Sequence, residues 1–286
     1  MKRLFGLLLA LVVMLACVGC GGGDDKAAAP AENKQEGDKV GALMPIGLDE
    51  ESYKRWTENI AEHEGRPAGY VAPRTVIFFD NMNSMVAALE AKQINRFATS
   101  NRVGNYIAAR NDALQVIDNN FKPILGYSIG MLDKDAAQIE EINTAIKAMK
   151  DDGTLAKLVK ENITDVAGEP AASDMPMIDG ADTIKVAVTG DMPAMDFVTA
   201  DGKPAGFNVA FLGELSKRIN KNIELVEVDA GARSAALTSG QVDALFWVIG
   251  VYDQDGNALP YPLDNTKGFA VSTPYLMDSR VGITLK

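Results

Sequence analysis

Between residues 39 and 249 the sequence alternates short apolar runs with amphipathic stretches of helical period. The runs at 75–79 and 184–188 have the length and the β-branched content of buried strands. The stretches at 50–63 and 207–219 carry apolar residues on one face at helical spacing. Strands and helices that alternate in this way build parallel sheets covered by helices, so we expect an α/β fold. The other expected strands are 39–43, 94–98, 125–132, 223–228 and 244–249, and the other expected helices are 82–92, 102–110, 135–150, 232–237 and one that begins at Thr154.

The first twenty residues have the pattern of an export signal. Two basic residues precede an almost entirely apolar run over 4–18, which is too short for a membrane span. Cys20 follows this run and a small residue, which resembles a bacterial lipobox, and Cys17 is a second candidate. We therefore expect residues 1–19 to be a lipoprotein signal peptide and Cys20 to carry lipid at the outer face of the membrane. The alternative is an ordinary secretory signal in which both cysteines are removed.

Composition excludes several kinds of functional site. The sequence has two cysteines, both within its first twenty residues, and one histidine, His63. A disulfide in the folded part, a Cys/His catalytic pair and a histidine-rich zinc site are therefore excluded, and we expect neither a metal nor a cofactor. The formal net charge of −11 argues against a nucleic-acid partner, because phosphates require a positive protein face.

Two low-complexity segments divide the chain. Residues 20–38 are rich in Gly, Ala, Asp, Glu and Lys without apolar periodicity, so we expect a flexible tether. A second segment, at about 167–180, repeats small residues and proline. It is expected to be either a linker between two parts of the fold or a plain surface loop.

Several motifs resemble the bacterial extracellular solute-binding proteins of family 3, the amino-acid type. Asp191-Met192-Pro193 and Gly206-Phe207-Asn208-Val209 resemble the first lobe of that family, as do 237–244 and 272–276. The segments 87–94, 127–131 and 143–159 resemble the second lobe, the strand that returns from it and the closing helices. In the family the first-lobe motifs come before these segments, whereas in this chain they come after them.

The resemblance implies a two-lobed, type II periplasmic-binding-protein-like fold with a hinge, and a chain that is circularly permuted. Lobe two would span 39–122 and lobe one 123–286, with the permutation linker at about 167–180. We expect a monomer, and the alternative is a domain-swapped pair in which each chain completes its neighbour.

The resemblance also implies a function. It predicts a non-enzymatic, lipid-anchored extracytoplasmic protein that captures an amino-acid-like or related small molecule between its lobes and contacts an ABC transporter permease. One alternative is a non-transporting lipoprotein that senses a ligand or binds a partner. Another is an enzyme similar to cyclohexadienyl dehydratases, although no spacing ties Asp80, Asp191 or Asp196 into an acid/base pair.

The charged clamps of the family's amino-acid binders are missing. The family places an arginine for the ligand carboxylate after the strand at 244–249, but 250–257 contains none, and Ser100 stands where the family has the acid for the amino group. A neutral group replaces a bidentate arginine poorly, so a free amino acid is a doubtful ligand. The candidate ligand-binding residues are Asp191, Met195, Asp196 and Phe197 in one strand-to-helix loop, Ser100, Asn101 and Arg102 in another, Asp80 and Asn81 after a third strand, and Trp247 and Arg233. Trp247 would stack on a ligand ring or pack in the core, and Arg102 would contact an anion or lie in solvent.

Overall fold

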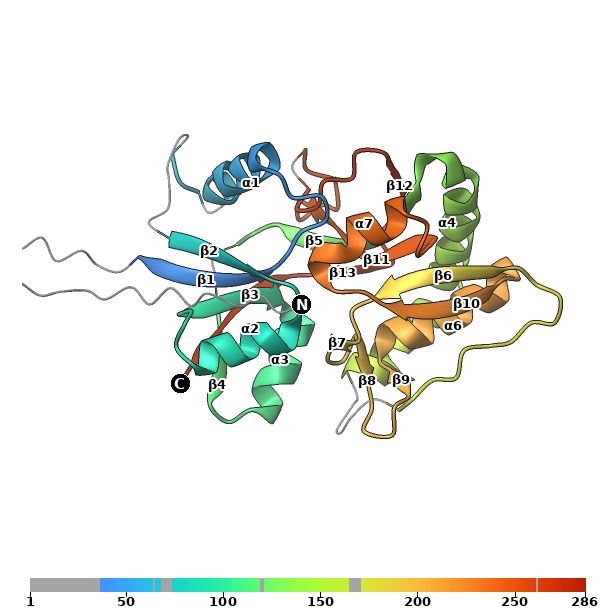
Figure 1. Cartoon of the computed structure of the whole chain (residues 1–286), viewed down its shortest axis with the longest axis horizontal. Coiled ribbons are helices and arrows are strands. Elements are labelled where there is room, and N and C mark those ends of the chain that lie inside the picture. The colour runs from blue at the N-terminus through green and yellow to red at the C-terminus, as the bar shows by residue number, and fades with distance from the viewer. Residues whose placement is uncertain (1–36, 64, 68–73, 119–120, 165–170, 261) are drawn as a thin grey trace, which may run out of the picture. The chain divides into compact units, whose positions relative to one another are not determined.

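The computed structural model describes residues 37–63, 65–67, 74–118, 121–164, 171–260 and 262–286. Their strands form two large mixed sheets and a small three-stranded sheet (Figure 1). The expected signal peptide, the expected lipidation at Cys20 and nearly all of the tether lie outside these ranges. None of the helices in the described ranges has the length and apolar character of a membrane span.

The first sheet has the strand order β2-β1-β3-β14-β4. Its strands are β1 (Asp38–Leu43), β2 (Arg74–Phe79), β3 (Arg96–Ser100), β4 (Leu114–Ile117) and β14 (Arg280–Leu285). Its helices are α1 (Glu50–His63), α2 (Met82–Glu90) and α3 (Asn101–Arg110). β1 runs parallel to β2 and β3, whereas β14 runs antiparallel to β3 and β4. Figure 1 shows α1 on one side of the sheet and α2 and α3 on the other.

The second sheet has the order β10-β6-β11-β5-β12, and β13 also pairs with β5. Its strands are β5 (Ile124–Leu132), β6 (Thr183–Val188), β10 (Asn222–Glu227), β11 (Ala244–Tyr252), β12 (Phe269–Val271) and β13 (Leu276–Asp278). Its helices are α4 (Ala136–Asp151), α5 (Thr154–Val159), α6 (Phe207–Ile219) and α7 (Arg233–Thr238). The small sheet is formed by β7 (Asp191–Met192), β8 (Asp196–Val198) and β9 (Pro204–Ala205).

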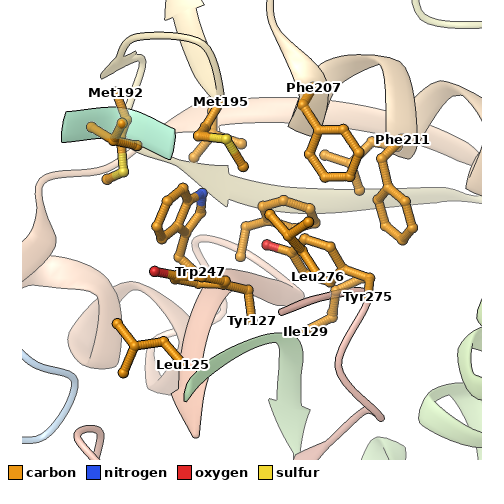
Figure 2. Packing of buried hydrophobic residues seen from close by; sticks show 14 of the residues in the cluster. Leu125, Tyr127, Ile129, Met192, Met195, Phe207, Phe211, Trp247, Tyr275 and Leu276 are labelled. Atoms are coloured by element: carbon orange, nitrogen blue, oxygen red, sulfur yellow. The ribbon is translucent and has the colours of Figure 1, made fainter. Parts of the chain in front are cut away.

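Hydrophobic packing fixes the helices to both faces of the second sheet. A large buried cluster joins α4 and α6 to the sheet, and a smaller one contains Ala236 and Leu237 of α7. In the large cluster the ring of Tyr275 stacks on Phe211 and Phe246, each with its centroid at 4.7 Å (Figure 2). Aromatic pairs at such distances add to the free energy of burial and hold β11 firmly on this face.

The expected mixture of strands and helices is confirmed, and the helices predicted at 50–63 and 207–219 have those bounds. The expectation of wholly parallel sheets is wrong. β5 is antiparallel to β11, β12 and β13, and β14 is antiparallel to both of its neighbours. A strand buried on both faces reads as a continuous apolar run whatever the direction of its partners, so the sequence pattern does not distinguish the two cases.

The expected lobe one and the second sheet differ at their C-terminal ends. The range 123–286 includes β14, but β14 pairs with β3 and β4 in the first sheet. The chain therefore passes between the two sheets twice, once from β4 to β5 and once from β13 to β14.

Candidate functional site

A pocket of about 80 Å³ lies between the two sheets. From the first sheet and its loops it is lined by residues 42–45, residues 98–100 and Arg280. From the second sheet and its loops it is lined by Leu125, Tyr127, Thr189, Met192, Ala230, Arg233, Trp247, Ile249, Leu263 and Asp264. Of the expected ligand-binding residues, the structure brings Ser100, Trp247 and Arg233 together in this wall.

Ser100 lies where β3 ends and α3 begins. Its hydroxyl accepts a hydrogen bond from the Val103 amide at 3.3 Å, which caps the helix, and its side chain is 4% exposed. Asn101 and Arg102 form the first turn of α3 but are not among the lining residues. The Arg102 amide donates to Oδ2 of Asp278 at 2.9 Å, and its Nε lies 3.8 Å from Oδ1 of the same carboxylate. Arg102 is therefore engaged by Asp278 beside the pocket.

Asp80 and Asn81 connect β2 to α2 and also lie outside the lining. Asn81 caps α2 by accepting a hydrogen bond from the Ser84 amide at 2.9 Å. The side chain of Asp80 is exposed, while its carbonyl accepts a hydrogen bond from the Ala230 amide at 2.7 Å. This short bond ties the α2 end of the first sheet to the loop before α7.

Asp191 approaches the N-terminus of α2 from the small sheet. Its Oδ2 accepts a hydrogen bond from the Asn83 amide at 2.9 Å, while its buried Oδ1 has no hydrogen-bond partner among the described residues. Burial raises the pKa of Asp191, and the backbone hydrogen bonds at the helix start oppose that shift. The next residue, Met192, lines the pocket, whereas Asp191 itself is not among the lining residues.

Asp196 is a buried hydrogen-bond acceptor rather than a cleft residue. Its side chain is 1% exposed and accepts from the amide and hydroxyl of Thr189 at 3.0 and 2.8 Å and from the Gly190 amide at 2.9 Å. It also accepts from Nδ2 of Asn208 at 2.6 Å and from the indole N–H of Trp247 at 3.0 Å. This carboxylate links the segment after β6 to α6 and to β11. Because both of its oxygens accept hydrogen bonds from these segments, it is not available to contact a ligand.

Met195 and Phe197 flank Asp196 and do not line the pocket. Met195 is buried in the large hydrophobic cluster (Figure 2). Phe197 lies beside a second, more open groove of about 380 Å³, between α2, α3 and the loop at Pro193. The strand-to-helix loop predicted as one binding element thus divides between the core, the pocket wall and another surface.

Trp247 places its ring between the pocket and the core (Figure 2). It meets the ring of Tyr127 edge to face with centroids 4.4 Å apart. Its φ of 62° lies in the left-handed region, where the β11–β5 register shifts between Leu245 and Val248. A non-glycine residue in this conformation is strained, and the hydrogen bond to Asp196 and the packing on Tyr127 hold it in place.

Arg233 and Asp264 are two buried charged residues of the pocket wall. The Arg233 guanidinium donates to the carbonyls of Ala230, Trp247 and Met44 at 3.0 to 3.1 Å. Burial lowers the pKa of Arg233, and the charge of Asp264 opposes that shift. Asp264 accepts from the amides of Ile46 and Ile249, both at 2.7 Å, and its pKa is raised by burial.

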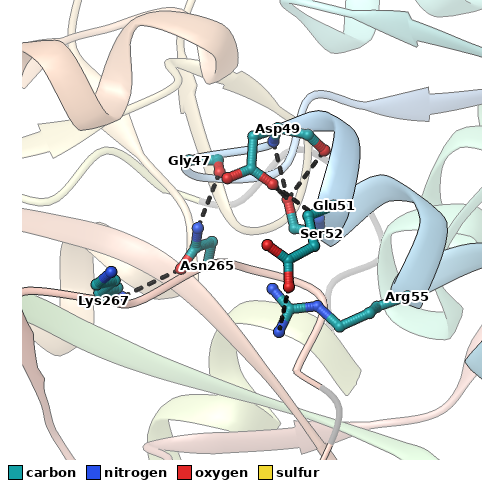
Figure 3. A network of polar contacts seen from close by, with 7 residues as sticks. All are labelled: Gly47, Asp49, Glu51, Ser52, Arg55, Asn265 and Lys267. Carbon is teal, nitrogen blue, oxygen red and sulfur yellow. Dashed lines mark hydrogen bonds and ion pairs between the residues drawn. The ribbon is translucent and has the colours of Figure 1, made fainter.

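The wall segment at Met44 and Pro45 is held by a polar network at its far end (Figure 3). Asn265 donates its amide to the carbonyl of Ile46 at 2.9 Å and its side chain to the carbonyl of Gly47 at 3.3 Å. Asp49 then caps α1 through the amide of Ser52 at 2.7 Å. The loop from β1 to α1 is therefore fastened to the segment that carries Asp264.

Sequence reasoning missed Tyr127, Asp264 and Asp278. Tyr127 and Asp264 line the pocket, and Asp278 follows β13 beside the start of α3. Tyr127 belongs to the segment 127–131, which resembles the returning strand and carried no expected ligand contact, whereas Asp264 and Asp278 belong to no motif. The described residues contain no group of three His, Cys, Asp or Glu side chains that would hold a metal ion.

Known proteins show where the similarity of this sequence lies. Residues 184–254 match the sequence profile of the bacterial extracellular solute-binding proteins, family 3. That segment runs through β6, the small sheet, α6, β10, α7 and β11, and so contains Asp191, Asp196, Arg233 and Trp247. No curated protein matches the sequence.

Solved structures of similar fold have low sequence identity to this chain. The ligand-binding component of an ABC-type import system from Staphylococcus aureus is 10% identical with a TM-score of 0.38, over 86% of this chain and 65% of that one. The methionine-binding protein MetQ is 10% identical with a TM-score of 0.39, over 87% and 83%. The GluR0 ligand-binding core in complex with L-glutamate is 10% identical with a TM-score of 0.39, over 88% and 86%.

The share of 65% means that this chain spans just under two thirds of the Staphylococcus aureus protein. Through residues 184–254 the chain is similar to the bacterial extracellular solute-binding proteins of family 3, and its described residues form two mixed α/β sheets.

Proposed function

We propose that the protein is a lipid-anchored, extracytoplasmic solute-binding protein that captures a small molecule in the pocket between its sheets and delivers it to the permease of an ABC importer. The observation that carries this proposal is the pocket, to which both sheets contribute walls and whose second-sheet wall comes largely from the segment of family 3 sequence. A pocket between two such bodies is a common form of ligand site. Ligand binding would favour closure of the sheets about the two connecting segments.

Ligand-dependent stabilisation tests this function. A ligand at 100 times its dissociation constant stabilises the folded state by about 2.7 kcal/mol, which is visible as a rise in Tm. The variant Ala98→Trp fills the pocket and should abolish the rise, whereas Ala113→Trp, at an exposed position in the same sheet region, should retain it. If no compound of a broad panel raises the Tm, the capture function is contradicted.

A second candidate is a lipoprotein that binds a protein partner without transporting a ligand. The observation in its favour is that Arg233 and Asp264, the two buried charged residues of the wall, are bonded to groups of the chain itself. An enzyme is disfavoured, because the carboxylate of Asp196 accepts five hydrogen bonds within the chain and neither Asp191 nor Asp80 lines the pocket.

The permuted order and the monomeric state are also part of this proposal. Their support is that β14, at the far end of the sequence from β3 and β4, fills the place between them within one chain. Light scattering on the purified protein tests the state, because a domain-swapped pair would have twice the mass of one chain. A variant that joins the ends near residues 38 and 285 and opens the chain between 165 and 175 should fold if the order of segments is a permutation.

Lipidation at Cys20 has a direct test. Mass spectrometry of the protein from bacterial membranes should give the mass of a chain that begins at Cys20 with acyl chains attached. Cys20→Ala should release the protein from the membrane, whereas Cys17→Ala should not. The opposite result would move the lipid to Cys17 or replace the anchor by an ordinary cleaved signal.

A further inference from the structure

We propose that the pocket takes an uncharged, largely apolar small molecule. The charged side chains of its wall and the N-termini of the helices beside it, which an ionic ligand would need, are already bonded to other groups of the chain. This inference rests on the proposed capture function and specifies the chemical class of the ligand. A pocket built for an amino acid would instead hold a carboxylate and an ammonium group.

The surface of the pocket is mostly apolar. Side chains of Leu43, Leu125, Met192, Trp247 and Leu263 lie in its wall. Burial of apolar ligand surface against such a wall is favourable by about 25 cal/mol per Å². The cavity of about 80 Å³ is roughly half of the ~150 Å³ apolar cavity that binds benzene in an engineered protein, so it suits a compact molecule.

The buried charges of the wall already have partners within the chain. Arg233 gives three hydrogen bonds to backbone carbonyls, and Asp264 accepts two from backbone amides. The third charged lining residue, Arg280, has its guanidinium carbon 5.2 Å from the centre of the Phe121 ring. Three of the five N–H donors of the Arg233 guanidinium are thus used by the chain, which leaves fewer of them for a ligand carboxylate.

Carboxylates of the chain also occupy the N-termini of α2 and α3, where a bound anion would be favoured. Asp278 accepts from the Arg102 amide in the first turn of α3, directly beside the lining residue Ser100. Asp191 accepts from the Asn83 amide in the first turn of α2. Both carboxylates reach these helices from distant parts of the sequence, 176 and 108 residues away. A second negative charge at either place would meet like-charge repulsion in a partly dry site.

Matched pairs of compounds test the ligand class on the full chain. Each pair shares one skeleton and differs in charge, for example 3-methylbutanamide with 3-methylbutanoate, benzyl alcohol with benzoate, and 3-methylbutanol with 3-methylbutylammonium. We expect the neutral member to raise the Tm and to bind at least about tenfold more tightly by calorimetry, since one unmatched charge costs about 1.4 kcal/mol or more. Ala98→Trp should remove the response, and Ala113→Trp should not.

Two contrary outcomes have different meanings. If the charged member binds as tightly or more tightly and Ala98→Trp abolishes its binding, the capture function stands and the neutral class is wrong. If neither member of any pair, nor any compound of the wider panel, raises the Tm, the capture function fails and the ligand class fails with it.

Removal of a built-in carboxylate gives an independent test. Asp278→Ala should create an anion site at the start of α3, so acetate should raise the Tm of this variant and leave that of the wild type unchanged relative to chloride. Asp278→Asn retains most of the side-chain volume and should not respond. If Asp278→Ala does not fold, Asp191→Ala provides the same comparison at α2. An equal response of wild type and variant to acetate would show that the helix starts are open to anions and would overturn the proposal.

Discussion

Trp247 donates its indole N–H to Oδ2 of Asp196 at 3.0 Å, and the same carboxylate accepts four further hydrogen bonds. These donors come from the end of β6, from α6 and from β11. The two residues expected to face a ligand therefore hold each other within the protein, and the shape of the pocket depends on their bond.

Replacement of Asp196 by alanine should destabilise the fold by at least about 3 kcal/mol. The change leaves several buried donors, including the Trp247 indole and Nδ2 of Asn208, without an acceptor, and each such group costs about 1–3 kcal/mol. Urea denaturation followed by circular dichroism measures the loss. The exposed Asp174→Ala should change stability by less than about 0.5 kcal/mol. Equal small effects of both variants would contradict the structural role of Asp196.

Replacement of Arg233 by methionine should cost about 3–5 kcal/mol. Asp264 would become a buried charge without its cation, and three carbonyls would lose their donor. The double variant Arg233→Met/Asp264→Asn should recover part of this loss, because it removes the unpaired charge. Lys147→Met, which breaks an exposed ion pair with Asp151, should cost no more than about 0.5 kcal/mol. Denaturant midpoints of these variants, of Asp264→Asn alone and of the wild type give the comparison, and additive effects of the two single changes in the double variant would argue against the coupling.

The stability contributed by Asp191 should rise as the pH falls. Burial raises its pKa in the folded protein above the unfolded value of 3.8, so the folded state takes up this proton first. Relative to Asp191→Asn, the wild type should gain stability as the pH falls from neutral through the folded pKa, with no further gain below about 3.8.

Denaturation of both proteins at a series of pH values gives this difference directly. The comparison is needed because burial also raises the pKa values of Asp264 and Asp278, whose effects remain in both proteins. Asp255→Asn, at an exposed turn, should follow the wild-type curve in parallel. A difference that is constant with pH, or that grows as the pH rises, would refute the assignment.

A methyl group at Gly231 should turn the Asp80 side chain away and leave the tie between the two sheets intact. An ideal Cβ at this position would lie 2.5 Å from Oδ1 of Asp80, which is the end of an exposed side chain that can rotate. We expect Gly231→Ala to change stability by less than about 0.5 kcal/mol and to leave hydrogen exchange unchanged at the Ala230 amide, which bonds to the Asp80 carbonyl. Faster exchange at that amide in Gly231→Ala would contradict the prediction.

Sequence periodicity predicted the helices well, because each buries one face against a sheet. α6 illustrates this, since Phe207, Phe211 and Leu215 lie at helical spacing and are buried. The same reasoning missed the short strands β7, β8 and β9, whose two or three residues are too few to show a period.

The pocket was less predictable than the fold. Ser100 and Trp247 were candidates because the family resemblance aligns them with its ligand-binding positions, and both line the pocket. The long-range bonds of Asp196 and Arg233 turned these two charges inward, and no local pattern reports a partner that lies in another element. Asp278 was missed for the same reason, since the Arg102 amide from which it accepts a hydrogen bond lies 176 residues earlier in the sequence.

The position of β14 also determines when the first sheet forms during synthesis. β3 and β4 are both present once about residue 117 has been made, but the strand that joins them comes last, and its Thr284 bonds to Asn95 across 189 residues. Until then, two strand edges remain unpaired, which is a hazard for aggregation, and closure over so long a loop is slow. A chain cut before residue 280 would therefore keep both edges open to other chains.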